Sequence, residues 1–276
     1  MTTGEQSDRS PVWSNDGSKL AYISNKSGKT ELYLRWMDTG HEMVLVNSEK
    51  TPGNITWSPD DRFLAFSMFV SESQASPIKM PAKPAGAEWN APPKYVDKLV
   101  WRMDGVGELP SGHQQLFTVP VSGGTPRQLT SAPYNHSSPE WSKDGRLIYF
   151  SANMREDAEL EAQDSDIYTI ELSTGAIKKI TNRYGPDSSP KISPNGRQLA
   201  YLGYNDEYKG YQLSRLYVAE ANGANPKLIS GNLDRDVNSI HWAADGKSLY
   251  FQYVGNLHVI IMEVQLKQLL IKIQCV

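Results

Sequence analysis

Five segments of the chain repeat one pattern, in which an apolar run ends in a polar turn and a second apolar run follows. They begin at residues 10, 54, 138, 189 and 239 and read SPVWSNDGSKLAYIS, NITWSPDDRFLAFSM, SPEWSKDGRLIYFSA, SPKISPNGRQLAYLG and SIHWAADGKSLYFQY. Asp-Gly, Asn-Gly or Asp-Asp fills each turn, where a tight connection favours residues that tolerate positive φ. Each segment is therefore expected to be a β-hairpin within a repeat protein.

The spacing of the repeat predicts a β-propeller. The equivalent residues Trp13, Trp57, Trp141, Ile192 and Trp242 lie 44, 84, 51 and 50 residues apart, and a four-stranded propeller blade takes roughly 40 to 50 residues. Further strand-like runs after each hairpin supply a third and a fourth strand. We therefore expect an all-β fold of about five four-stranded antiparallel blades in an incomplete ring, near residues 10–47, 54–130, 137–182, 188–230 and 238–276.

Two features qualify this architecture. The 84-residue interval holds an insertion, residues 70–113, whose Pro, Ala and Gly content is typical of an excursion from a blade and not of a separate core. The tail QLKQLLIKIQCV lacks the turn residues of the earlier blades, so it is either a short helix or a further strand. A linear β-solenoid is the alternative fold, but it requires a shorter period and no Asp-Gly hairpins.

Composition excludes several classes of partner. The 276 residues carry 28 basic and 31 acidic side chains without a long block of like charge, so we expect no nucleic-acid partner. No run approaches the roughly 18 apolar residues of a membrane span. MTTGEQSDRS is not a signal peptide, which predicts a cytoplasmic protein, or a periplasmic one if the true N-terminus is missing. The single cysteine, Cys275, allows no intrachain disulfide.

The repeated W-S-x-D-G-x-x-L-x-Y/F resembles the propeller of the prolyl oligopeptidase family of serine peptidases, and also the periplasmic propeller of the Tol system. GEQSDRSPVWSNDGSKLAYIS, VWRMDGVGEL and NMREDAELEAQDSDIYTIELSTGAIKKIT look like the acylaminoacyl peptidase and dipeptidyl aminopeptidase branch of that family. The resemblance covers residues 4 to 253. It implies a larger propeller that sits on an α/β-hydrolase domain and limits which peptides reach the catalytic serine.

The chain departs from the family pattern in ways that bear on function. It contains no Gly-x-Ser-x-Gly nucleophile elbow and no alternation of strands and helices after the last hairpin. We therefore expect a propeller truncated before the catalytic domain and inactive by itself, which gates and positions short peptides for an absent hydrolase domain. The alternatives are a stand-alone Tol-like module that binds a peptide or protein partner, and a sugar-processing propeller with a metal in its channel.

Five residues are candidates for a functional role, three for contact with a substrate and two for lining the channel. The resemblance places Trp101, Arg102 and Asp104 of WRMDG near the face where propeller meets hydrolase, where a guanidinium can hold a peptide carboxylate or carbonyl. The simpler interpretation is an Arg-Asp pair that pins a long loop. His136 and His241 are candidates for lining the channel, but their offsets from the blade tryptophans differ, so we expect no metal and no cofactor.

The remaining expectations concern surfaces. The acidic run 156–166 lacks the Asp spacing and fixed Gly of a calcium loop, which favours a solvated loop. One tryptophan per blade at the same position indicates packing between blades. An open ring leaves an apolar face on its first and last blades, so we expect self-association.

Overall fold

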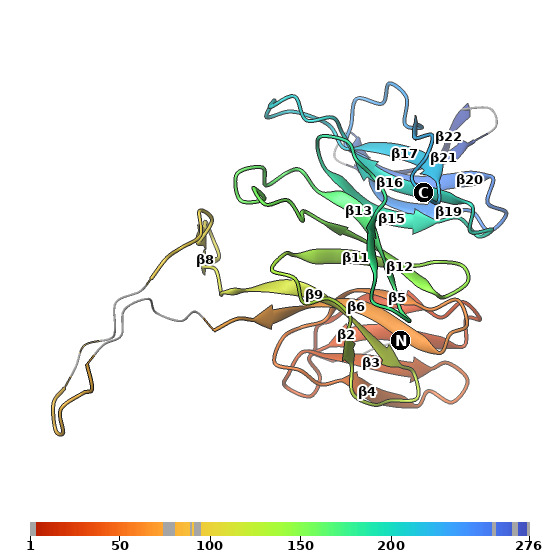
Figure 1. Ribbon diagram of the computed structural model, residues 1–276. Coiled ribbons are helices and arrows are strands. Elements are labelled where there is room, and N and C mark those ends of the chain that lie inside the picture. Colours follow the sequence, from red (N-terminus) through yellow and green to blue (C-terminus); the bar gives the residue numbers. More distant parts are fainter. Residues whose placement is uncertain are drawn as a thin grey trace.

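The computed structural model describes residues 4–73, 81–88, 90, 95–255, 258–266 and 270–274. These residues form five four-stranded antiparallel sheets arranged as blades in a ring (Figure 1). This confirms the expected all-β fold and the number of blades. Cys275 lies outside the described residues.

Each blade takes four strands in antiparallel order. The first blade consists of β1 (Asp8–Trp13), β2 (Lys19–Ser24), β3 (Glu31–Trp36) and β4 (Glu42–Val46), and the second of β5 (Gly53–Trp57), β6 (Phe63–Ser71), β9 (Gly112–Pro120) and β10 (Arg127–Gln128). The third consists of β11 (His136–Trp141), β12 (Leu147–Ala152), β13 (Asp166–Glu171) and β14 (Ile177–Lys179), and the fourth of β15 (Asp187–Ile192), β16 (Gln198–Gly203), β17 (Arg215–Glu220) and β18 (Lys227–Leu228). The fifth consists of β19 (Asn238–Trp242), β20 (Ser248–Gly255), β21 (His258–Gln265) and β22 (Leu270–Gln274).

The insertion and the tail extend the repeat without changing it. β6 pairs directly with β9 from Phe63 opposite Pro120 to Ser71 opposite Gly112, so the insertion joins the second and third strands of one blade. In the tail, β22 pairs with β21, which selects the strand over the helix. The described residues include no helix of the length and apolarity that crossing a membrane requires.

The first strand of every blade contains a β-bulge. Its register shifts at one residue of positive φ, between 47° and 54°, in all five blades: Ser10, Asn54, Ser138, Ser189 and Ser239. Ser and Asn tolerate this left-handed conformation better than β-branched residues do. Because a bulge bends the strand and re-aims the side chains after it, all five inner strands present the following residues alike.

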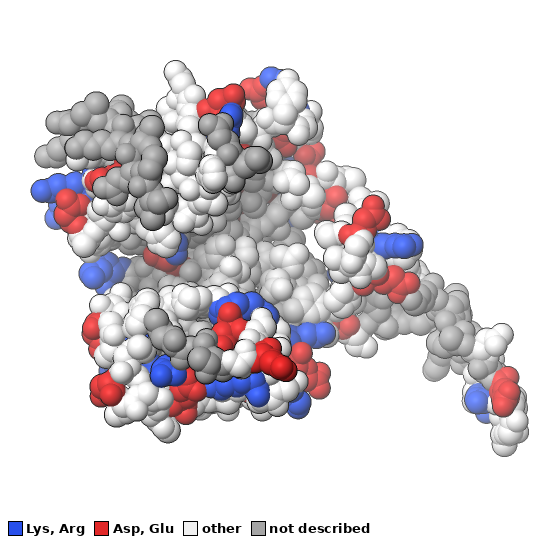
Figure 2. Space-filling view, turned by 180° about the vertical axis from the view of Figure 1, so that it is seen from behind, with Lys and Arg blue, Asp and Glu red and all other residues white. Residues whose placement is uncertain are grey.

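Neighbouring blades pack through these inner strands and through the faces of the sheets. β5 packs on β1 and on β11, and β15 packs on β11 and on β19, whereas no comparable packing joins β19 to β1 in the described part of the chain. The buried core lies between adjacent sheets, as where Ile23 and Leu34 of the first blade cluster with Phe66 and Val119 of the second. Figure 2 shows a hollow between the first and the last blades, as expected for an open ring.

Two of the repeated tryptophans are hydrogen-bonded to the preceding blade. Trp57 Nε1 donates to the carbonyl oxygen of Val12 at 3.0 Å, and Trp242 Nε1 donates to that of Lys191 at 2.9 Å. Trp57 is 6% exposed, whereas Trp13, in the first blade, is 48% exposed. The tryptophan position is therefore a docking point between blades, as the repeat predicted.

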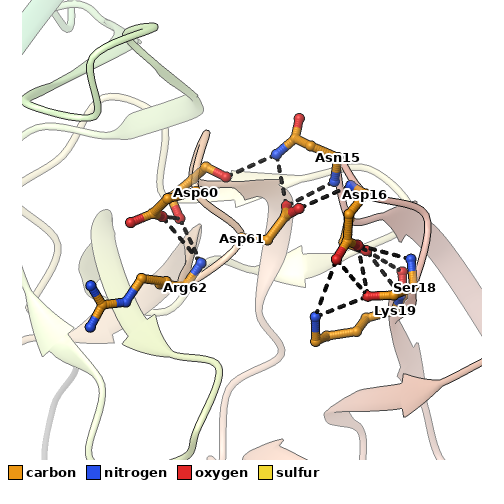
Figure 3. A network of polar contacts seen from close by, with 9 residues as sticks. Asn15, Asp16, Ser18, Lys19, Asp60, Asp61 and Arg62 are labelled. Atoms are coloured by element: carbon orange, nitrogen blue, oxygen red, sulfur yellow. Dashed lines mark hydrogen bonds and ion pairs between the residues drawn. The ribbon is translucent and has the colours of Figure 1, made fainter.

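In four of the five blades the turn between the first two strands is built around a buried serine; the fifth has Ala243 at this position. In the third blade, Ser142 Oγ donates to Asp144 at 2.6 Å and accepts from the amide of Leu147 at 2.9 Å, and Ser14, Ser58 and Ser193 act similarly. Asp61 stands where the other blades have glycine, and it takes the same positive φ. Its carboxylate reaches the turn of the first blade (Figure 3).

Candidate functional site at the inner edge of the ring

The residue directly before each blade tryptophan, or before its equivalent Ile192, forms a row across the inner strands. Each member follows its bulge residue by two positions and therefore shares one register along the strand. Since consecutive inner strands pack together, the row crosses the blades side by side. Its members, called here the inner row, are Val12, Thr56, Glu140, Lys191 and His241.

The polar end of the inner row is electrostatically coupled. Lys191 Nζ donates to Glu140 Oε2 at 2.8 Å, and both side chains are partly buried. Desolvation of the ring by the surrounding strands lowers the pKa of His241, and the positive charge of Lys191 lowers it further against the opposing effect of Glu140. The His241 side chain still reaches solvent, so its imidazole lies at the surface beside the pair of Lys191 and Glu140.

His136 occupies a different environment. It lies two residues before its bulge, at the start of β11, whereas His241 lies two residues after its own. His136 has no exposed surface, its ring packs on Phe150 at 5.4 Å between centroids, and burial lowers its pKa. The structure therefore does not bring the two histidines together. Within the described ranges, no group of three or more His, Cys, Asp or Glu is arranged to hold a metal.

Trp101, Arg102 and Asp104 lie on a small hairpin of the insertion. Its strands are β7 (Arg102–Met103) and β8 (Gly107–Glu108), and the Leu109 amide donates to the carbonyl of Trp101 at 2.8 Å. Trp101 is 42% exposed. The described side chains show no ion pair between Arg102 and Asp104. The hairpin projects from the second blade, away from the inner strands β5 and β11 (Figure 1). Contact of its residues with a substrate stays a prediction.

The described part of the insertion projects on the same side as the corresponding loops of the next two blades, residues 153–165 and 204–214 (Figure 1). Insertion and loop touch where the amide of Leu99 donates to Glu159 Oε2 at 3.2 Å. Three large side chains on these loops are more than 70% exposed: Leu160, Tyr208 and Tyr211. This side of the ring, called here the loop face, therefore combines apolar and acidic side chains.

Part of the acidic run 156–166 is structural, so the expectation of a solvated loop is wrong for its last residues. Asp164 is 4% exposed and accepts from Arg155 Nη1 at 2.8 Å and from the amide of Gly185 at 2.9 Å. Asp166 is 2% exposed and pairs with Lys179 Nζ at 2.6 Å. Burial of these two carboxylates is compensated by hydrogen bonds that reach across to other segments.

Next to them lies a buried ion pair that the sequence did not indicate. Asp187 is fully buried at the start of β15 and pairs with Arg183, whose guanidinium lies 4.0 Å above the ring of Tyr217. Burial raises the pKa of Asp187 to about 6 despite the opposing charge of Arg183. The two residues are only four positions apart in sequence, but their burial is not evident from it, because it depends on how the third and fourth blades meet.

With this geometry established, comparison with known proteins shows what the chain is similar to. Residues 104–209 match the family model of the Dipeptidyl peptidase IV (DPP IV) N-terminal region. The matched segment is less than half of the chain. It runs from Asp104 of the inserted hairpin through the third blade and into the loop after β16.

Curated relatives are peptidases that are much longer than this chain. The Uncharacterized peptidase YuxL of Bacillus subtilis is 30% identical over 170 residues, which is 61% of this chain and 25% of the relative. Dipeptidyl-peptidase 5 of Porphyromonas gingivalis is 24% identical over 291 aligned residues, which is 97% of this chain and 40% of the relative. The chain therefore spans between a quarter and two fifths of these relatives and corresponds to the propeller part of peptidase-family proteins.

Solved structures show the same fold at low sequence identity. Pyrococcus horikoshii acylaminoacyl peptidase superposes with a TM-score of 0.71 at 16% identity, covering 98% of this chain and 38% of that protein. TolB from Acinetobacter baumannii superposes with a TM-score of 0.66 at 14% identity, covering 98% and 54%. These likenesses concern the fold alone.

Proposed function

We propose that this chain is the non-catalytic propeller part of a serine peptidase, which gates and positions short peptides for an α/β-hydrolase domain. The observation that carries the proposal is the match of residues 104–209 to the DPP IV N-terminal region, together with peptidase relatives of which the chain spans only 25% and 40%. The proposal assigns selection of the substrate to the propeller and chemistry to a part outside this chain.

The inner row supports the proposal chemically. Glu140 and Lys191 place opposite charges at the inner edge of the ring, beside the imidazole of His241. A short peptide carries an ammonium group and a carboxylate at its two ends, which the two side chains complement. The side chain of Lys191 is 34% exposed and that of Glu140 is 17% exposed. Lys191 is therefore the more accessible of the two to a ligand that replaces its partner.

Hydrolysis tests the non-catalytic part of the proposal. The purified chain is incubated with acylated and free dipeptide nitroanilides, and a serine-directed fluorophosphonate probe is applied in parallel. The expected result is no turnover and no labelled serine. Stoichiometric labelling of one serine would show a nucleophile within this chain and overturn the non-catalytic role.

Binding of a short peptide tests the positioning role. Acetyl-Ala-Phe, with its free carboxylate, is titrated into the chain and into Lys191→Gln, with Lys178→Gln as a control because Lys178 is exposed on β14, outside the inner row. The expected result is saturable binding that Lys191→Gln weakens and Lys178→Gln does not. Equal affinities of all three proteins would contradict positioning by the inner row.

A Tol-like interaction module is the second candidate, favoured by the superposition on TolB over 98% of this chain. In this case a protein surface or a longer segment, and not a dipeptide, would occupy the mouth of the channel. Failure of acetyl-Ala-Phe to bind, together with the absence of turnover, would favour this candidate.

A further inference from the structure

A groove separates the second and third blades at the end of the ring opposite the insertion. β6 runs from the turn at Phe63 to the insertion at Ser71, so the turns and the insertion lie at opposite ends of the blade. The groove has a volume of about 680 Å³, within the range of ligand sites. Its walls include Pro59, Phe63, Pro120, Arg127, Trp141 and Lys143.

One part of the groove is apolar and accessible. Phe63 is 38% exposed and lies opposite Pro120 in the register of β6 and β9, while Trp141 is 7% exposed and forms the deeper part of the lining. Thr118 and Thr125 also line the space. Apolar surface with a few polar groups at its edge is the usual composition of a site for a ligand with both characters.

The acidic residues of the groove already have hydrogen-bond partners, whereas its basic residues have free donors. Asp60 already accepts from Ser58 Oγ at 2.6 Å, and Asp144 accepts from Ser142 Oγ at 2.6 Å and from an arginine of its own turn. By contrast, the described residues offer no carboxylate partner to Arg127 or Lys143, and the guanidinium of Arg127 makes only a 3.4 Å contact with the carbonyl of Leu172. The groove therefore has free cationic donors, while its anions are engaged.

We propose that this groove binds an extended peptide segment in which an acidic residue is next to an apolar one. Arg127 and Lys143 hold the carboxylate, as a guanidinium and an ammonium do at many carboxylate sites. Phe63 and Trp141 contact the apolar side chain, and the two threonine hydroxyls hydrogen-bond with the peptide backbone. A lone carboxylate would leave most of the 680 Å³ and the exposed ring of Phe63 unused. The proposal is independent of the inner row.

Fluorescence anisotropy with a defined peptide tests the groove. The probe is fluorescein-labelled Gly-Leu-Glu-Leu-Gly amide, and its counterpart has Gln in place of Glu. The variant Arg127→Gln/Lys143→Gln is compared with Lys178→Gln/Arg197→Gln, which makes the same change of charge with two exposed residues outside the groove. The expected result is saturable binding that falls by about tenfold or more in the first variant, in Phe63→Ala and with the Gln peptide, and stays within about twofold in the control.

A reversal of charge separates recognition from damage to the fold. Arg127→Glu/Lys143→Glu should lose the Glu peptide and gain Gly-Leu-Lys-Leu-Gly amide at an unchanged melting temperature. No saturable binding to the native chain, an equal loss in the control, equal binding of the Gln peptide, or displacement of the probe by free acetate at equal concentration would each overturn the proposal. Binding of acetyl-Ala-Phe through Lys191 is measured separately, so the two proposals fail independently.

Discussion

Asp61 of the second blade accepts two hydrogen bonds from Asn15 of the first, each at 2.8 Å. One comes from the backbone N–H of Asn15 and the other from its side-chain Nδ2. The other oxygen of the carboxylate accepts from the amide of Asp16 at 3.0 Å (Figure 3). These bonds join two turns that are 45 residues apart in sequence. Asp61 therefore links the two blades while it holds a conformation, φ 55°, that favours glycine.

Replacing Asp61 separates the linkage from the conformational cost. Asp61→Gly loses the hydrogen bonds but relieves the backbone, so a net loss of about 1 kcal/mol in the free energy of unfolding is expected. Asp61→Ala loses the hydrogen bonds and keeps the strained backbone conformation, so it should cost about 1 kcal/mol more than Asp61→Gly. Urea unfolding of both variants measures the difference. If Asp61→Gly proves more stable than the native chain, the bonds to Asn15 and Asp16 contribute little.

The hairpins were predictable from sequence because their determinants are local. Asp-Gly and Asn-Gly turns, and the alternation around them, depend on neighbours within about fifteen residues, and all five hairpins form where the motif predicts them. The Asp61 linkage was not predictable in this way. Asp60-Asp61 only indicates another turn, and Asn15, to which Asp61 is bonded, lies in a different blade.

The candidate site was less predictable, for the same physical reason. His241 was recognised as a channel candidate, but Glu140 and Lys191 were not, although each directly precedes its blade's repeat position as His241 does. Only the packing of successive inner strands brings the three together. The buried Asp187 was missed because no sequence pattern distinguishes an acid that tertiary packing encloses.

The exposed Trp13 is expected to mediate self-association. Its counterparts Trp57 and Trp242 donate to the preceding blade, while Trp13 is 48% exposed. Trp13→Ser should reduce a concentration-dependent dimer seen by analytical ultracentrifugation and change monomer stability little. Trp57→Phe, as the comparison, should cost about 1 kcal/mol of stability through its lost hydrogen bond. A native chain that is monomeric at all concentrations would contradict the prediction.

The bulge in the inner strand should discriminate sharply between substitutions at Ser138. At φ 52°, Ser138→Gly is expected to leave the free energy of unfolding within about 0.5 kcal/mol, whereas Ser138→Val should lower it by about 2 kcal/mol because a β-branched side chain is strained there. Chemical unfolding provides the measurement. Equal stability of the two variants would show that the strand adjusts its register without cost.

Asp187 should make stability fall as pH rises through mild acidity. Burial raises the pKa of Asp187 to about 6, above the value near 4 of an unfolded chain, so folding favours the protonated acid. The stability that this group contributes is complete below about pH 4 and is lost as pH rises through about 6. Between these limits the native chain should lose on the order of 1 to 3 kcal/mol relative to Asp187→Asn. If the free energies of unfolding of the two proteins changed with pH in the same way, a raised pKa of Asp187 would be excluded.

The inner row predicts opposite effects of two matched substitutions on His241. The charge of Lys191 lowers the pKa of His241 and that of Glu140 raises it. Lys191→Gln should therefore raise the pKa of His241 toward its usual range, while Glu140→Gln should lower it further. Titration of the imidazole Cε1 proton by NMR follows both changes in the folded protein. Each substitution also breaks the 2.8 Å pair between Lys191 and Glu140. If that loss merely loosened the site, the pKa of His241 would move in the same direction in both variants. Shifts of opposite sign would instead establish that the three side chains sense one another across three blades.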